Sequence, residues 1–373
     1  MRALRTSHEG TPDFSWMPDS RHVVVAIKTS REAATQLWMA DTRSQERHAL
    51  TSGTTTSISP VVSPDGRRIA FTELTRIFDV LSVDLATAAV HPLVLTERDE
   101  SMPAWASKKP ALAFVTDRNG PQELWLHVDG SPDRPLVTAR DFPPDTTQWF
   151  MGPALSPEAD RVVYTRVETQ GGGAHLWISA LAGGAPVPLT NDSVSTEYPG
   201  SWSPDGNWFA YLSMRNDHWS LMKAKASGQA VPIAVKADAD RTNDAVPCWS
   251  LAGDWIVYGE NLYSPDGATV KSLGSHKSAA YVFAPDGKRV YGMRADGDKE
   301  LLFSVDIATG QEKIVGDAGK NFRPASNLNP AIRFSMAPDG KSFVYSAPRS
   351  SSNLWILEGF GGKAGFFARL GLR

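Results

Sequence analysis

Residues 201–213 read SWSPDGNWFAYLS, and this phrase decides the fold. Pro204 presets the φ angle that the second position of a β-turn requires. Asp205 can hydrogen-bond its neighbouring backbone, and Gly206 accepts the left-handed conformation from which the next strand starts. The run after the turn, residues 207–213, is too short and too aromatic for a helix. The phrase therefore predicts a β-hairpin.

Versions of this hairpin recur along the whole chain. Each is followed by a third run of the Leu-Trp type and by a closing run, so each unit supplies four short strands. The turn prolines repeat about every 46 residues, close to the roughly 40–50 residues of a four-stranded propeller blade. The eight units lie near residues 14–50, 58–95, 101–138, 150–190, 197–235, 244–275, 278–316 and 330–360.

These repeats predict one all-β domain over residues 1–360, a β-propeller of four-stranded antiparallel blades. We expect eight blades, or seven if the short sixth unit is not a full blade. The start of the chain parallels the closing run of a blade, so residues 1–6 are predicted to pair beside residues 353–358 and close the ring. The alternative is that residues 365–372, within a C-terminal tail of 361–373, fill that position.

Charge and cysteine content exclude several classes of protein. The net charge of −3 offers no basic surface for nucleic acid. Cys248 is the only cysteine, so an internal disulfide is excluded, and we expect a buried small side chain there. There is no transmembrane run, and the first residues lack the apolar core of a signal peptide. We expect a cytoplasmic protein if Met1 is the native start, and a periplasmic or extracellular one if the chain is a piece of an exported protein.

The recurring pattern W/V-S-x-P-D-G, then an I-A-F or V-Y run, then L-W/Y-x-x-D, resembles the TolB-type, WD-like propeller repeat of bacteria. The resemblance covers nearly the whole chain. It implies a propeller like those of TolB in the Tol–Pal system, of sensor or scaffold domains in bacterial regulators, or of prolyl-oligopeptidase-like enzymes. Two features depart from it. TolB proper resembles a six-bladed propeller behind an α/β domain and a secretion signal, whereas this sequence has eight units and neither of those features. A hydrolase of the peptidase type would need a Gly-x-Ser-x-Gly pentapeptide, and none occurs.

Candidate binding residues lie on the loops between second and third strands and on the crossings between blades, because loops on a rigid scaffold often carry function. Arginines recur after the second strand, and a ring of them could receive a carboxylate or phosphate. Alternatively, each pairs with a nearby aspartate such as Asp117 or Asp217 and holds its own loop. The candidates for binding a ligand or partner are Arg118, Trp149, Glu197, Arg215, Arg294 and Arg349.

Two histidines are weak candidates for binding a metal. His175 and His218 lie one repeat apart, each at the start of a third strand, but no third ligand is evident. The alternative is that they are polar residues at strand ends. The aspartates of the Pro-Asp-Gly turns are expected to form the turns and not a catalytic carboxylate set. We therefore expect no metal and no cofactor.

The function that these features favour is a non-catalytic, monomeric module that binds a protein, peptide or ligand. It would be the sensor or scaffold part of a larger bacterial regulatory or TolB-like protein. The alternative is an enzyme, a lyase or hydrolase acting on sugars or peptides at the mouth of the channel. Convergent histidine or carboxylate clusters would favour the enzyme, and arginines, aromatic residues and unpaired polar loops would favour binding.

Overall fold

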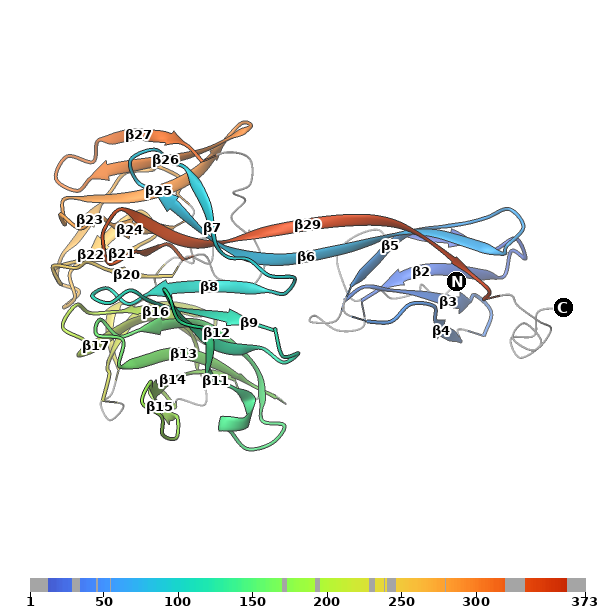
Figure 1. Cartoon of the computed structure of the whole chain (residues 1–373), viewed down its shortest axis with the longest axis horizontal. Helices are drawn as coiled ribbons and strands as arrows, with labels where there is room; N and C mark the ends of the chain where they lie inside the picture. The colour runs from blue at the N-terminus through green and yellow to red at the C-terminus, as the bar shows by residue number, and fades with distance from the viewer. Residues whose placement is uncertain are drawn as a thin grey trace. The chain divides into compact units, whose positions relative to one another are not determined.

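The structure is a computed structural model. It describes residues 13–28, 34–44, 46–53, 55–169, 173–191, 195–227, 232–237, 239, 246–278, 280–318 and 333–360. The chain divides into two compact units, residues 77–348 and residues 1–76 with 349–373. The described strands form seven antiparallel sheets, and the helix among the described residues is a short 3-10 turn at Ala139–Asp141 (Figure 1). The prediction of an all-β fold is confirmed. No described helix has the length and apolarity of a membrane span.

Five sheets of the larger unit each consist of four strands that pair in chain order. Their strands are β8 (Glu100–Trp105), β9 (Ala111–Thr116), β10 (Glu123–Val128), β11 (Arg134–Val137), β12 (Thr147–Leu155), β13 (Arg161–Glu168), β14 (Ala174–Ala180), β15 (Val187–Pro188), β16 (Ser195–Trp202), β17 (Trp208–Arg215), β18 (His218–Lys225), β19 (Ile233–Lys236), β20 (Cys248–Trp249), β21 (Ile256–Tyr258), β22 (Asn261–Tyr263), β23 (Val270–Ser272), β24 (Tyr281–Phe283), β25 (Arg289–Asp296), β26 (Lys299–Asp306) and β27 (Glu312–Asp317). The short sixth repeat, β20–β23, is thus a complete sheet. In the hairpin predicted from residues 201–213, Trp202 lies opposite Phe209.

The sixth sheet of this unit combines two distant parts of the chain. It contains, in order, β28 (Ser335–Met336), the start of β29 (Ser342–Glu358), the end of β6 (Arg68–Asp84), and β7 (Val90–Val94). The backbone N–H of Leu85 donates to the carbonyl of Lys341 at 2.9 Å beside this junction. The second and eighth repeats therefore share one sheet, which is why seven sheets are found where eight repeats were counted.

The shared sheet leaves fewer strand edges unpaired than its two parts would separately. Each of the two hairpins, β28–β29 and β6–β7, would by itself leave an edge strand unpaired, and joining them removes both edges. The predicted closing strand, residues 1–6, and the alternative, residues 365–372, lie outside the described residues. The assignment of all the repeats to one domain stays a prediction.

Hydrophobic clusters join each sheet of the larger unit to the next, and a further cluster joins the last sheet to the first. One cluster joins the sheets of β8–β11 and β12–β15, and similar clusters follow at the next three junctions. Another joins the sheet of β24–β27 to the shared sheet. The last contains Val80 and Val344 of the shared sheet with Leu112 and Phe114 of β9. Six sheets therefore form a closed ring, in which each sheet is covered by its two neighbours.

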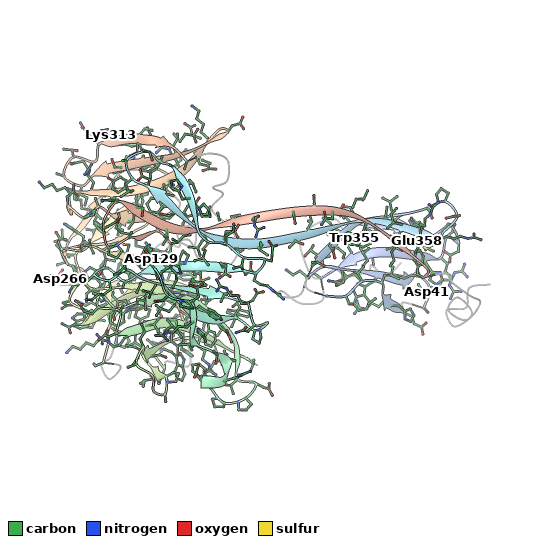
Figure 2. The ribbon with its side chains drawn as sticks, viewed as in Figure 1. Asp41, Asp129, Asp266, Lys313, Trp355 and Glu358 are labelled. Carbon is green, nitrogen blue, oxygen red and sulfur yellow. The ribbon has the colours of Figure 1, made fainter. Side chains whose placement is uncertain are left out.

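The smaller unit contains the first repeat. Its strands are β1 (Phe14–Trp16), β2 (His22–Ile27), β3 (Gln36–Asp41), β4 (Arg47–Ala49) and β5 (Thr56–Val62), with residues 68–76 of β6 and 349–358 of β29. Val24, Leu37 and Ile69 form part of its core. At the end of β29, Leu354 and Trp355 are exposed; Figure 2 labels Trp355.

Candidate functional site

The inner strands of the six sheets in the larger unit enclose a pocket of about 120 Å³. Its wall contains the last residue of the first strand of each sheet: Trp105, Leu155, Trp202, Trp249, Phe283 and Met336. It also contains the residue before each of these, which is smaller: Ala104, Ala154, Ser201, Cys248, Val282 and Ser335. Small side chains at this second position leave space on the axis of the ring, and the larger ones enclose that space.

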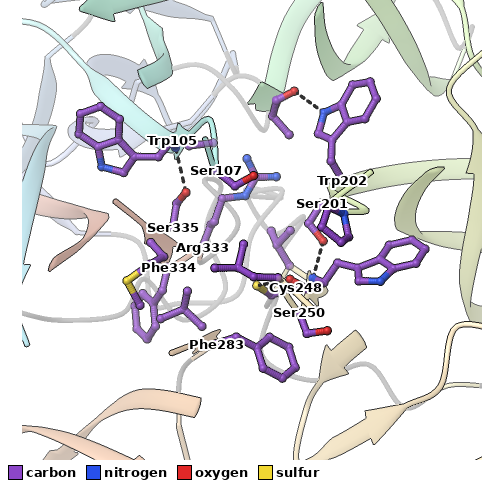
Figure 3. A pocket seen from close by; sticks show the side chains of 18 of the residues that line it. Trp105, Ser107, Ser201, Trp202, Cys248, Ser250, Phe283, Arg333, Phe334 and Ser335 are labelled. Atoms are coloured by element: carbon purple, nitrogen blue, oxygen red, sulfur yellow. Dashed lines mark hydrogen bonds between the residues drawn. The ribbon is translucent and has the colours of Figure 1, made fainter. Parts of the chain in front are cut away.

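Two serines of the pocket wall connect neighbouring sheets. The Ser201 hydroxyl accepts a hydrogen bond of 2.8 Å from the backbone N–H of Trp249. Ser335 occupies the same place in its own repeat and accepts one of 2.9 Å from the backbone N–H of Trp105 (Figure 3). Each contact joins one inner strand to the inner strand of an adjacent sheet. The same residues therefore both hold the ring and line its pocket.

Arg333 is the charged residue in this wall (Figure 3). Its side chain is buried, and the residue is only 8% exposed. The guanidinium donates to the carbonyl oxygens of Gly200 at 2.7 Å, of Gly152 at 3.4 Å and of Pro153. No carboxylate among the described residues forms an ion pair with it. Burial lowers the pKa of Arg333 to about 10, so the group still carries its charge at neutral pH.

Cys248 also lies in the pocket wall, and the residue as a whole is partly exposed. Burial raises the pKa of the Cys248 thiol to about 11. The thiol is therefore protonated at neutral pH, and a protonated thiol is a poor nucleophile.

Two of the predicted arginines pair with carboxylates in their own sheets. Arg118 contacts Glu100 at 2.8 Å and Asp133 at 2.9 Å. Arg294 contacts both carboxylate oxygens of Glu312, at 2.6 and 2.8 Å. This local pairing is the alternative that the sequence left open, although the partners are not Asp117 or Asp217. Their role in binding stays a prediction.

The remaining two predicted arginines differ in position. Arg215 is exposed at the end of β17 in the larger unit. Arg349 belongs to the smaller unit. The structure therefore does not describe the four arginines as one ring.

Glu197 belongs to a buried hydrogen-bond network. Its carboxylate accepts from the Ser195 hydroxyl at 2.5 Å and the Thr190 hydroxyl at 3.1 Å, and its Oε2 lies 2.7 Å from His175 Nδ1. The network lies inside the protein and ties the start of β16 to β14. It is an arrangement that satisfies buried polar groups and so stabilises the fold.

Trp149 and His218, the other candidates, lie apart from the pocket. Trp149 packs against the cluster between the sheets of β8–β11 and β12–β15. His218 is exposed at the start of β18. No group of three or more histidine, cysteine, aspartate or glutamate side chains with the geometry of a metal site occurs in the described part of the chain.

The pocket lies at the end of the inner strands that leads into the Pro-Asp-Gly turns, whereas the predicted site was placed on loops at the other end. A signal for Arg333 is present in the sequence. If the first strands are aligned on their last residues, the position three residues earlier is occupied by Met102, Gly152, Pro199, Val246, Ala280 and Arg333. Only the last of these is charged. This signal is invisible until the first strands of the six sheets are known and aligned.

Comparison with known proteins supports the fold. No protein-family model and no curated protein matches the sequence. The structure is similar to that of a putative TolB from Agrobacterium tumefaciens, with a TM-score of 0.52 and 16% identity over 74% of this chain and 99% of that chain. The fold is a TolB-type β-propeller.

Two further similar structures have lower TM-scores. The propeller matches a nidogen/laminin complex with a TM-score of 0.48 and 10% identity, over 64% of this chain and 97% of that chain. It matches TolB from Acinetobacter baumannii with a TM-score of 0.37 and 14% identity, over 90% of this chain and 65% of that chain.

Proposed function

We propose that the larger unit of this TolB-type propeller binds a protein or peptide partner at its axial pocket, without catalysing a reaction. The observation that supports this is the wall of the pocket itself. Trp105, Trp202, Trp249 and Phe283 are part of a mainly apolar lining on a rigid scaffold, and Arg333 provides one charge. Concave, mostly apolar sites with few polar groups are typical of ligand binding, and aromatic residues and arginine dominate binding energy in many interfaces.

The chemistry of the wall favours binding over catalysis. The Cys248 thiol is protonated at neutral pH because burial raises its pKa to about 11. The described lining residues include serines but neither a histidine nor a carboxylate that could activate them. We therefore propose that the unit acts as the sensor or scaffold part of a larger bacterial protein.

A peptide library displayed on phage tests this proposal. Peptides are selected on the full chain and then measured against Leu251→Asp, which places a charge on an exposed residue of the pocket wall. Leu95→Asp is the matched control, because Leu95 is also an exposed leucine of the larger unit but does not line the pocket. We expect Leu251→Asp to weaken binding at least tenfold and Leu95→Asp to leave it unchanged.

Two results would contradict the proposal. Equal binding by both variants would show that the pocket is not the binding site. Conversion of a bound peptide into a product, detected by mass spectrometry and absent from the buffer control, would show that the unit is an enzyme.

A further inference from the structure

We propose that Arg333 makes the axial pocket a receptor for a carboxylate attached to an apolar or aromatic group. The inference rests on the proposed binding function and names the chemistry that the pocket recognises.

The first argument is the environment of the cation. Buried charges are normally paired with an opposite charge, because removing a charge from water is costly. Arg166, which is also buried, follows this rule and contacts Glu168 at 2.5 Å. Arg333 is buried to a similar degree, but its described partners are the three carbonyl oxygens. Carbonyl oxygens satisfy N–H groups without neutralising the charge, so an anion in the pocket would be favoured.

The second argument is the polar groups nearby. The hydroxyl oxygens of Ser201 and Ser335 accept backbone N–H groups, and no described residue accepts either hydroxyl hydrogen. A serine hydroxyl can donate one hydrogen bond while it accepts others. Both side chains line the same pocket as Arg333 (Figure 3). The wall therefore offers donors to an anion, and its described residues include no carboxylate that would repel one.

The third argument is the space and the character of the remaining wall. The cavity of about 120 Å³ is several times the roughly 10–15 Å³ that one water requires on this measure. Nη1 and Nη2 of Arg333 already donate to the three carbonyls, whereas Nε donates to no described residue and can donate a charge-assisted hydrogen bond to a carboxylate. Trp105, Trp202 and Phe334 are among the residues that line the pocket, and they make its wall mainly apolar beside Arg333. A carboxylate on an apolar group matches both parts of this wall.

Binding of small probes to the full chain tests the inference. N-acetylphenylalanine carries a main-chain carboxylate, N-acetylphenylalanine amide is its uncharged match, and N-acetylglutamate amide carries a side-chain carboxylate. Dissociation constants are measured by calorimetry and by the fluorescence of the pocket tryptophans. We expect N-acetylphenylalanine to bind at least tenfold more tightly than its amide. The third probe distinguishes a peptide terminus from an acidic side chain as the source of the carboxylate.

Two variants assign the preference to Arg333. Arg333→Gln should abolish the tenfold preference, while Arg134→Gln should retain it, because Arg134 is an exposed arginine on β11 outside the pocket. The comparison of carboxylate with amide on the unaltered chain decides the question even if Arg333→Gln does not fold. Equal affinity for the two probes, or a preference that survives in folded Arg333→Gln, would overturn the inference.

The outcomes also separate this inference from the proposed function. Peptides that depend on Leu251 but bind equally as acids and amides would contradict the carboxylate inference alone. A carboxylate preference that depends on Arg333, with no peptide that depends on Leu251, would contradict the proposed peptide-binding function alone.

Discussion

The hydroxyl of Ser335 accepts a hydrogen bond from the backbone N–H of Trp105, although 230 residues separate them in the sequence. The contact joins β28, in the shared sheet, to β8, in the first sheet of the larger unit that is made from a single repeat. Ser201 and Trp249 form the same contact between two sheets that follow one another in the chain. The hydrogen bond that joins the shared sheet to the sheet of β8–β11 is thus the same kind of contact that joins two sheets consecutive in the chain.

Replacing Ser335 with alanine tests this closing contact. The substitution leaves a backbone N–H without its acceptor, which should lower the free energy of unfolding by about 1–3 kcal/mol. Ser201→Ala is the matched control, because it removes the equivalent contact elsewhere in the ring, and we expect a loss of similar size. Chemical denaturation measures both. A loss for Ser201→Ala together with no loss for Ser335→Ala would show that the closing contact does not form in solution.

The pH dependence of stability tests the burial of Arg333. Because burial lowers the pKa of Arg333 from its ordinary value to about 10, the unfolded chain binds more protons than the folded chain as the pH rises through 10. The free energy of unfolding should therefore rise with pH relative to that of Arg333→Gln, by up to about 1.4 kcal/mol per pH unit. Below about pH 9 the difference between the two proteins should be constant.

Urea denaturation of both proteins at pH 8, 9, 10 and 11 gives this difference directly. Using the difference removes the contribution of other groups that titrate in the same range. If the difference in the free energy of unfolding between the two proteins stays constant up to pH 11, the description of Arg333 as a buried guanidinium without a counter-ion is contradicted.

Substitution of Arg294 distinguishes the axial pocket from the loop face at the other end of the inner strands. Its hydrogen bonds hold the pKa of Glu312 below the ordinary value. Arg294→Ala should let that pKa rise and lower stability by at most about 1 kcal/mol, because the pair is partly exposed. NMR titration and denaturation measure the two effects. We expect affinity for the carboxylate probes to be unchanged; a loss of affinity would instead support the arginine site predicted from the sequence.

The hairpins could be predicted because their turns are encoded locally. In the phrase that begins at Ser201, the Asp205 carboxylate accepts the Ser203 hydroxyl at 2.5 Å and the Asn207 N–H at 3.0 Å. Gly206 has a φ of +71°, which a residue with a side chain rarely adopts. Other turn aspartates accept backbone N–H groups in the same way. The expectation that they form turns is confirmed.

The pairing of distant strands could not be predicted, because equivalent repeats do not encode which of them share a sheet. The repeat near residues 58–95 was expected to supply four short strands, yet residues 68–84 form the single 17-residue strand β6. The end of this strand completes the sheet begun by β28 and β29. The pocket was missed for the same reason, since its wall and Arg333 come together only when six inner strands surround one axis.

Hydrogen–deuterium exchange of the full chain at increasing urea concentration tests the closed ring most directly. The amides of residues 77–94 and 335–348, which form the shared sheet, are followed together with those of β16–β18. If the ring is closed as described, both groups should become exposed in one cooperative transition, because each sheet is held by its neighbours. Exchange of the shared sheet at clearly lower urea, while β16–β18 stay protected, would contradict the closed ring of six sheets.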